Sequence, residues 1–140
     1  MKIFKVFITL GTVLLGLPSA LAMTTSDQID QIDIMMANNG YSSGSSNYGR
    51  LDKNTSTTST LQASAGKNYF VVSVCDTDCR DIDVQVTDKY GDIVGKDADS
   101  TDMALVQFRA NYSGTYTVKT TMYNCQTSYC MYRTKSYVDR

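Results

Sequence analysis

Residues 68–87, NYFVVSVCDTDCRDIDVQVT, decide the fold class of this chain. Apolar side chains recur there at every second position, as at Phe70, Val72 and Val74 and again at Ile82, Val84 and Val86. Successive side chains of a β-strand point to opposite faces, so a period of two is typical of strands. A short polar segment bounded by cysteines separates the two runs. The stretch therefore predicts two consecutive strands with a tight connection.

The same alternation continues toward the C-terminus. It recurs over residues 104–109 and 116–123, and a last run rich in Tyr and Thr covers residues 129–138. Turn signals such as Tyr90-Gly91 and Ser113-Gly114 separate these runs. Half-buried strands joined by short turns predict an antiparallel β-sandwich.

Four short motifs that follow one another in order give the chain a family resemblance. They are Gly66-Lys-Asn-Tyr69, Asp81-Ile-Asp-Val-Gln-Val-Thr-Asp88, Tyr90-Gly-Asp92 and Ser113-Gly-Thr-Tyr-Thr-Val118. Over residues 48–140 this pattern resembles the bacterial pre-peptidase C-terminal (PPC) domain. The resemblance implies a jelly-roll-like β-sandwich with a binding role, in some relatives for collagen or other polymers and sometimes for Ca²⁺, and it transfers no catalytic residue. The cysteines fall outside the usual pattern of that domain, and with them the chain is similar to stand-alone exported bacterial proteins.

The first 22 residues predict a secretory signal peptide. Lys2 and Lys5 precede an apolar run over residues 6–17, and Ala20-Leu-Ala22 is a cleavage site of the Ala-x-Ala kind. The alternative is an uncleaved anchor, but the run is shorter than the ~20 residues that span a bilayer. We therefore predict an exported protein, periplasmic or extracellular, whose mature chain begins at Met23.

A short helix is predicted over residues 25–39. Thr25 and Gln28 have the spacing of a capping box, an apolar stripe contains Ile29, Ile32, Met35 and Met36, and Asn39-Gly40 supplies the stop. The stripe docks either on the sheet of the same domain or on a partner. Residues 41–48, rich in Gly, Ser and Asn, read as a flexible linker. Residues 23–47 are thus expected to precede a sandwich over 48–140, in which the polar run 54–60 suits an edge strand or a loop.

The four cysteines of an exported chain predict disulfides. The spacings of Cys75 with Cys79 and of Cys125 with Cys130 each fit a short loop, so these pairs are favoured. Cross-pairing between the loops stays open, because sequence does not fix connectivity.

Composition argues against several kinds of chemistry. Cleavage after Ala22 leaves 11 basic residues against 14 aspartates, a net charge of −3, whereas nucleic-acid binding favours a basic face. The chain has no His and no G-x-S-x-G turn, so no nucleophile and base are apparent. Asp81 and Asp83 share a strand face and could in principle act as a glycosidase pair, although such pairs are usually surface residues. We predict a protein that is not an enzyme.

Nine of the 14 aspartates lie between Asp76 and Asp102. Ca²⁺ binds six to eight oxygens, mostly carboxylates and carbonyls of loops. The ordinary alternative is that Asp in turns bonds nearby backbone amides. The candidate Ca²⁺ ligands are Asp76, Asp78, Asp81, Asp83, Asp97, Asp99 and Asp102.

The ten tyrosines indicate recognition rather than turnover, because Tyr offers large amphipathic contact area at low entropic cost. Tyr116 is assigned to the core. Tyr112, Tyr123, Tyr129 and Tyr132 lie at turns or on outward strand phases and are the candidate partner surface. The predicted function is an exported binding or assembly module for an extracellular or envelope protein, a polymer or a second copy. The alternatives are a Ca²⁺-binding accessory domain of a secreted enzyme system or a small hydrolase.

Overall fold

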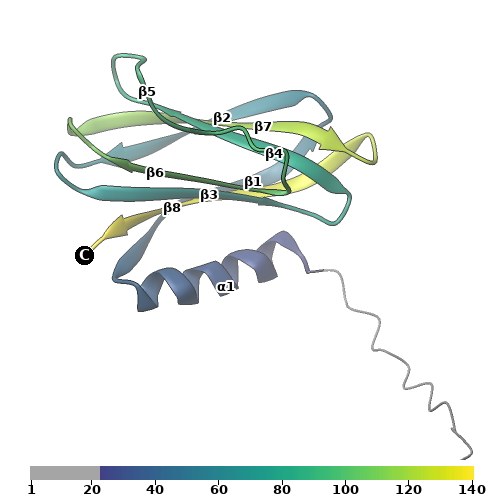
Figure 1. Ribbon diagram of the computed structural model, residues 1–140, viewed down its shortest axis with the longest axis horizontal. Helices are drawn as coiled ribbons and strands as arrows, with labels where there is room; N and C mark the ends of the chain where they lie inside the picture. The colour runs from purple at the N-terminus through teal and green to yellow at the C-terminus, as the bar shows by residue number, and fades with distance from the viewer. Residues whose placement is uncertain (1–22) are drawn as a thin grey trace, which may run out of the picture.

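The structure is a computed structural model that describes residues 23–140, and the predicted signal peptide, residues 1–22, lies outside the described residues. Figure 1 shows two stacked layers of strands, with one helix against the outer face of one layer. Within the described range, no helix has both the length and the apolar character needed to cross a bilayer. The elements are α1 (Thr25–Asn38), β1 (Tyr41–Asp52), β2 (Thr55–Ala63), β3 (Asn68–Cys75), β4 (Cys79–Thr87), β5 (Ile93–Asp97), β6 (Met103–Arg109), β7 (Gly114–Cys125) and β8 (Tyr129–Asp139).

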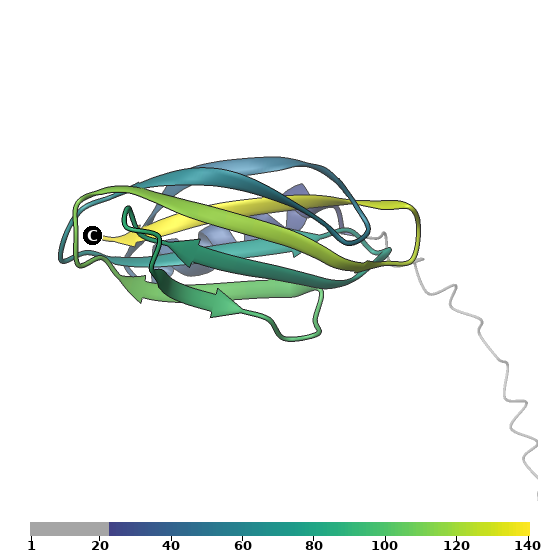
Figure 2. The same ribbon diagram turned by 90° about the horizontal axis from the view of Figure 1, so that it is seen from above.

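The two layers are antiparallel sheets of four strands each. Sheet A has the strand order β1-β8-β3-β6, and sheet B has the order β2-β7-β4-β5. Successive strands lie in opposite sheets except for β4 and β5, which pair with each other in sheet B, an order typical of a jelly roll. Figure 2 shows the stacked strands from above. The predicted fold class, an antiparallel jelly-roll-like β-sandwich with one short N-terminal helix, is confirmed.

The flexible linker predicted over residues 41–48 is wrong, because this segment is part of β1. Its residues pair with β8 from Tyr41 onward, with a bulge between Ser43 and Ser46. The strand is held by backbone hydrogen bonds. Its Ser-, Gly- and Asn-rich sequence has no apolar alternation, which is why the sequence pattern did not indicate a strand. The glycine at position 44 lets β1 pack closely against β8, since a Cβ there would lie 2.5 Å from Ser136 Oγ. The sandwich therefore begins at Tyr41 rather than at residue 48.

Two edge strands of sheet B complete the architecture. The polar run 54–60, which suited either a strand or a loop, forms β2 from Thr55 onward and pairs with β7. The short strand β5, which was not predicted from the sequence, pairs with β4. A Cβ at Gly95 of β5 would lie only 2.2 Å from Val106 Cγ1, so this glycine lets β5 approach β6 closely.

The core lies between the sheets and follows the predicted alternation. At its centre, the Thr134 hydroxyl is hydrogen-bonded to the hydroxyls of Ser73 and Thr120. Buried hydroxyls are stable only when they are paired, and these three satisfy one another. The inward apolar residues of the predicted strands are all buried: Ile82, Val84, Val86, Ala104, Val106, Phe108, Tyr116, Val118 and Met122.

Helix α1 docks on sheet A of its own domain. Thr24 is the N-cap and forms a capping box with Asp27, one residue before the predicted pair of Thr25 and Gln28. Ile29 and Met36 are buried against the sheet, whereas Met35, predicted in the same stripe, is 53% exposed. The helix therefore buries one narrow stripe, and the first of the two docking alternatives is correct.

A polar contact that the sequence did not reveal fastens α1 to β8. Asp33 of the helix accepts hydrogen bonds from Lys135 Nζ at 2.7 Å and from the Tyr137 hydroxyl at 2.8 Å. Burial pushes the pKa of Asp33 upward, but the hydrogen bonds from Lys135 and Tyr137 outweigh it and hold this pKa below its ordinary value. The carboxylate is thus ionised when the helix is docked.

Candidate functional site

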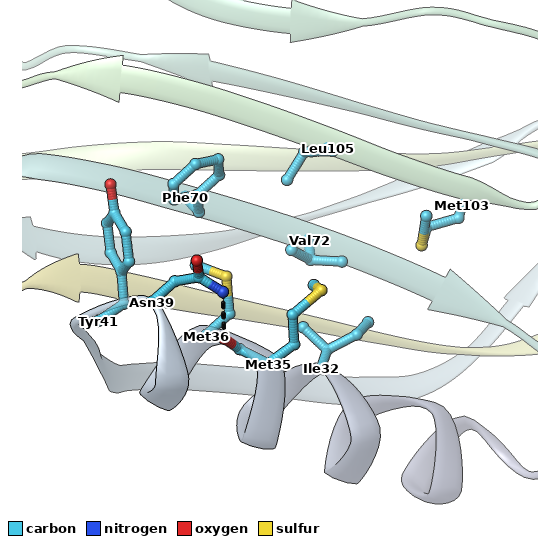
Figure 3. Close-up of a pocket in the computed structure, with 9 residues that line it drawn as sticks. All are labelled: Ile32, Met35, Met36, Asn39, Tyr41, Phe70, Val72, Met103 and Leu105. Carbon is cyan, nitrogen blue, oxygen red and sulfur yellow. Dashed lines mark hydrogen bonds between the residues drawn. The ribbon is translucent and has the colours of Figure 1, made fainter.

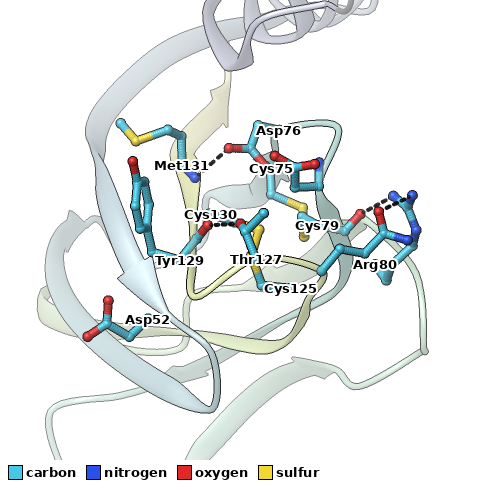
Figure 4. Close-up of a disulfide and its surroundings, with 12 residues drawn as sticks. Asp52, Cys75, Asp76, Cys79, Arg80, Cys125, Thr127, Tyr129, Cys130 and Met131 are labelled. Carbon is cyan, nitrogen blue, oxygen red and sulfur yellow. Dashed lines mark hydrogen bonds between the residues drawn. A yellow bond between two sulfur atoms is a disulfide. The ribbon is translucent and has the colours of Figure 1, made fainter.

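Both disulfides lie at one end of the sandwich (Figure 4). They join Cys75 to Cys79 and Cys125 to Cys130, so the predicted pairing is confirmed and cross-pairing is wrong. Each bond links the end of a strand in one sheet to the start of a strand in the other. Two bonds that are local in sequence therefore tie the two sheets together at this end.

Several of the candidate Ca²⁺ ligands have ordinary roles in turns. Asp76 accepts a hydrogen bond from the Met131 amide at 2.8 Å, and Asp97 accepts one from the Leu105 amide at 2.8 Å. The amides of Asp78 and Asp99 also donate to Asp76 and Asp97, at 3.3 and 3.1 Å. The backbone carbonyl oxygen of Asp102 lies 3.1 Å from Cys75 Sγ, which has no hydrogen to donate because it is part of a disulfide. Asp76 and Asp97 thus each bond to a backbone amide two residues on, as Asp commonly does in turns, and to a second amide on a neighbouring strand.

Asp81 and Asp83 of β4 lie close together. One oxygen of each carboxyl is shielded from solvent and has no hydrogen-bond partner among residues 23–140. Burial, followed by repulsion from Asp81 and Asp97, raises the pKa of Asp83 to about 6. Across residues 23–140, no three His, Cys, Asp or Glu side chains form a group that could hold a metal ion. The structure therefore gives no support to Ca²⁺ binding by the seven candidate aspartates.

The four candidate tyrosines do not form one surface. Tyr112 packs edge-on against Tyr90 in the loops at the end remote from the disulfides, with ring centroids 5.1 Å apart. Tyr123 is exposed on β7 of sheet B, and Tyr129 is exposed at the start of β8 in sheet A. The prediction for Tyr132 is wrong, because this residue is only 5% exposed.

The alternation of β8 explains the error at Tyr132. Cys130, Tyr132 and Thr134 share the inward face of the strand, and all three are buried. The Tyr132 hydroxyl accepts a hydrogen bond from Asn47 Nδ2 at 3.1 Å. Tyr132 is therefore a core residue with a satisfied hydroxyl, as Tyr116 was predicted to be.

The outward faces of β1 and β8 carry the most distinctive exposed cluster, which we call the Arg–Tyr surface: Tyr48, Arg50, Tyr129, Met131 and Arg133. In the β1–β8 ladder, Tyr48 lies opposite Arg133 and Arg50 lies opposite Met131. The Arg133 guanidinium carbon lies 4.5 Å from the centre of the Tyr48 ring, and that of Arg50 lies 4.2 Å from the centre of the Tyr129 ring. Two arginines are thus stacked on two tyrosines across neighbouring strands, a cation–π arrangement.

The Arg–Tyr surface is open to solvent. Tyr48 is 65% exposed, and Arg50, Tyr129 and Met131 are also exposed. Tyr129 and Met131 lie beside the disulfide end of the sheet (Figure 4). Tyr, Arg and Met are enriched at the centres of protein interfaces.

Sequence reasoning found only one residue of this surface, Tyr129. A signal was present in the period-two pattern Tyr48-x-Arg50 and again in Tyr129-x-Met131-x-Arg133. The first half was hidden because residues 41–48 read as a linker. These two patterns come together only because the first strand pairs with the last. That pairing cannot be inferred from the local sequence.

An apolar groove lies between α1 and the outer face of sheet A (Figure 3). Its volume is about 350 Å³. Met35 of the helix and Met103 and Leu105 of β6 line it and are exposed, because α1 packs over β1, β8 and β3 and leaves β6 uncovered. The groove holds almost no polar group that could orient a ligand.

Comparisons with known proteins give a likeness of fold. No protein family and no curated protein match the chain. Among solved structures, this chain is similar to the crystal structure of Aeromonas hydrophila PliG, a periplasmic lysozyme inhibitor of g-type lysozyme. The match covers 68% of this chain and 85% of the PliG chain, with a TM-score of 0.51 and 14% sequence identity. At this identity the likeness shows the fold alone, and the resemblance to the PPC domain stays a prediction.

Proposed function

We propose that the mature chain is an exported, non-enzymatic module that binds another protein. The Arg–Tyr surface carries this proposal, because stacked Tyr and Arg side chains on a rigid sheet combine contact area with directed hydrogen-bond donors. The adjoining disulfides support it by tying the strand ends at this surface to the opposite sheet. They also fit an oxidising compartment outside the cytoplasm, in agreement with the predicted signal peptide.

The fold likeness supports the same proposal and suggests the first partner to test. The similar protein PliG is a periplasmic inhibitor of g-type lysozyme, so its fold is compatible with binding a protein partner. A g-type lysozyme is therefore the first probe, and proteins of the cell envelope are the second.

The test measures binding of the mature protein, residues 23–140, to a purified g-type lysozyme and, in parallel, to envelope proteins. We expect Tyr48→Ala and Tyr129→Ala each to weaken the complex by about tenfold or more, as for residues at an interface centre. Tyr123→Ala is the matched control, because Tyr123 lies between Tyr48 and Tyr129 in exposure but is on sheet B.

Two results would contradict the proposal. One is multiple-turnover hydrolysis of any substrate by the pure mature protein. The other is a complex with lysozyme or an envelope protein that weakens equally for all three tyrosine variants. The melting temperatures of the variants should stay within about 2 °C, because surface substitutions rarely change stability by more than ~0.5 kcal/mol.

A further inference from the structure

We infer that the Arg–Tyr surface recognises carboxylate groups on its protein partner, an inference that rests on the proposed function and names the partner's chemistry. The two arginines of the surface are the groups that would make this contact. Each lies over a tyrosine ring, Arg133 over Tyr48 and Arg50 over Tyr129. Stacking fixes the plane of a guanidinium without using its N–H donors.

The guanidinium N–H donors of both arginines are free of partners among residues 23–140. Among residues 23–140, no hydrogen bond or ion pair joins the Arg50 or Arg133 guanidinium to another side chain or carbonyl, and Arg133 Nε is shielded without a partner. Arg80 shows the contrast, since it donates to the carbonyls of Thr77 and Cys79 at 2.7 and 3.0 Å. A planar guanidinium with free N–H groups matches the two oxygens of a carboxylate.

The charge around the surface favours an acidic partner. Lys135, the next cation on β8, is neutralised by its ion pair with Asp33. Asp52 stands at the rim, opposite Tyr129 in the ladder. The Asp76 carboxylate also lies beside this surface, but it accepts a hydrogen bond from the Met131 amide at 2.8 Å. The two arginines, which form no ion pair among residues 23–140, can therefore orient an approaching acidic surface.

The same features favour a protein over an anionic polymer. Tight binding of a polyanion requires many cations along its length, and this surface has two. Met131 lies on β8 between Tyr129 and Arg133, and together with the tyrosine rings it provides apolar contact area that a phosphate polymer would not use. The composition is that of a protein–protein contact with acidic side chains.

Immobilised poly-L-glutamate is the probe for carboxylate recognition, used with the mature, disulfide-bonded protein at about 50 mM salt. We expect measurable binding that Arg50→Gln and Arg133→Gln each weaken by about fivefold, as partly exposed charge contacts do. Replacing both arginines by Lys keeps the charge but loses the planar fork, so it should weaken binding less than the double Gln variant. Lys119→Gln, an exposed cation on sheet B, is the control and should change binding by less than about twofold.

Salt and a competing polyanion complete the test. Raising the salt to about 300 mM should weaken binding severalfold, because exposed charges are screened. Absence of binding to polyglutamate, equal binding by the Arg→Gln variants, or tighter binding to inorganic polyphosphate would each overturn the inference. Any of these results, combined with a tyrosine-dependent complex with lysozyme or an envelope protein, would leave the proposed function standing.

Discussion

Replacing Asp33 by Asn tests whether one carboxylate holds α1 on the sheet. Tyr137, one of the two side chains that donate to Asp33, is 1% exposed. Asn offers its buried hydroxyl a weaker acceptor than the carboxylate, and this loss should cost about 1–2 kcal/mol of stability. The contact with Lys135 is partly exposed and contributes roughly 0.5 kcal/mol after solvent screening. We therefore expect Asp33→Asn to lower the free energy of unfolding by about 2 kcal/mol.

Urea denaturation of the mature protein measures this loss. Asp30→Asn is the matched control, because Asp30 is an exposed carboxylate on the same helix. Tyr137→Phe removes the donor of the same hydrogen bond. A double-mutant cycle between Asp33 and Tyr137 should give a coupling energy of about 1 kcal/mol. Equal losses for the two Asn variants, or strict additivity in the cycle, would refute the assigned contact.

The same carboxylate predicts a dependence on pH. The pKa of Asp33 is lower in the folded chain than its ordinary value of 3.8, so the folded state binds this proton less tightly than the unfolded state. The contribution of Asp33 is present above that ordinary value and is lost as the pH falls through the lower folded pKa. Asp33→Asn should therefore lose less stability than the unsubstituted protein on acidification below about pH 4.

Three further predictions concern stability. Gly95→Ala should cost about 1–3 kcal/mol in thermal denaturation because its Cβ would overlap Val106, whereas Gly49→Ala, with its nearest contact at 3.7 Å, should be close to neutral. The pKa of Asp83 is raised to about 6, so its folded form retains the proton and stability should fall as the pH rises from about 4 to 6. This fall, about 1 kcal/mol after allowance for partial exposure, should disappear in the pH profile of Asp83→Asn. Replacing both cysteines of the Cys125–Cys130 disulfide by Ser should cost about 1–2 kcal/mol in urea denaturation, because the closed loop is short; an unchanged midpoint would contradict this.

The two-layer fold was predictable because the buried positions of each half-exposed strand are apolar and recur at every second residue. Ile82, Val84 and Val86 point inward as expected, and the local disulfide pairing follows from short cysteine spacings. Strands β1 and β5 were missed for a different reason. Their stability comes from backbone pairing at sheet edges, and their sequences contain few of the apolar side chains that mark a strand.

The candidate site was less predictable because it depends on register. Tyr48 meets Arg133 only because β1 pairs with β8 at one particular offset. A shift by one residue would turn every side chain to the other face, and it is this phase that placed Tyr132 in the core instead of on the surface. Local sequence therefore identified tyrosine as a residue type of the candidate surface, but not Arg50, Met131 or Arg133.

The nested strand order has a consequence for how the chain is made. The first strand pairs with the last, the second with the seventh, the third with the sixth and the fourth with the fifth. β1 can acquire its partner in the ladder only after β8 has been synthesised, so an incomplete chain cannot close sheet A. Folding that needs such distant contacts cannot be completed until the last strand has been made. The edge strands β1 and β2, each of which has a single partner, stay without one until β8 and β7 have been synthesised.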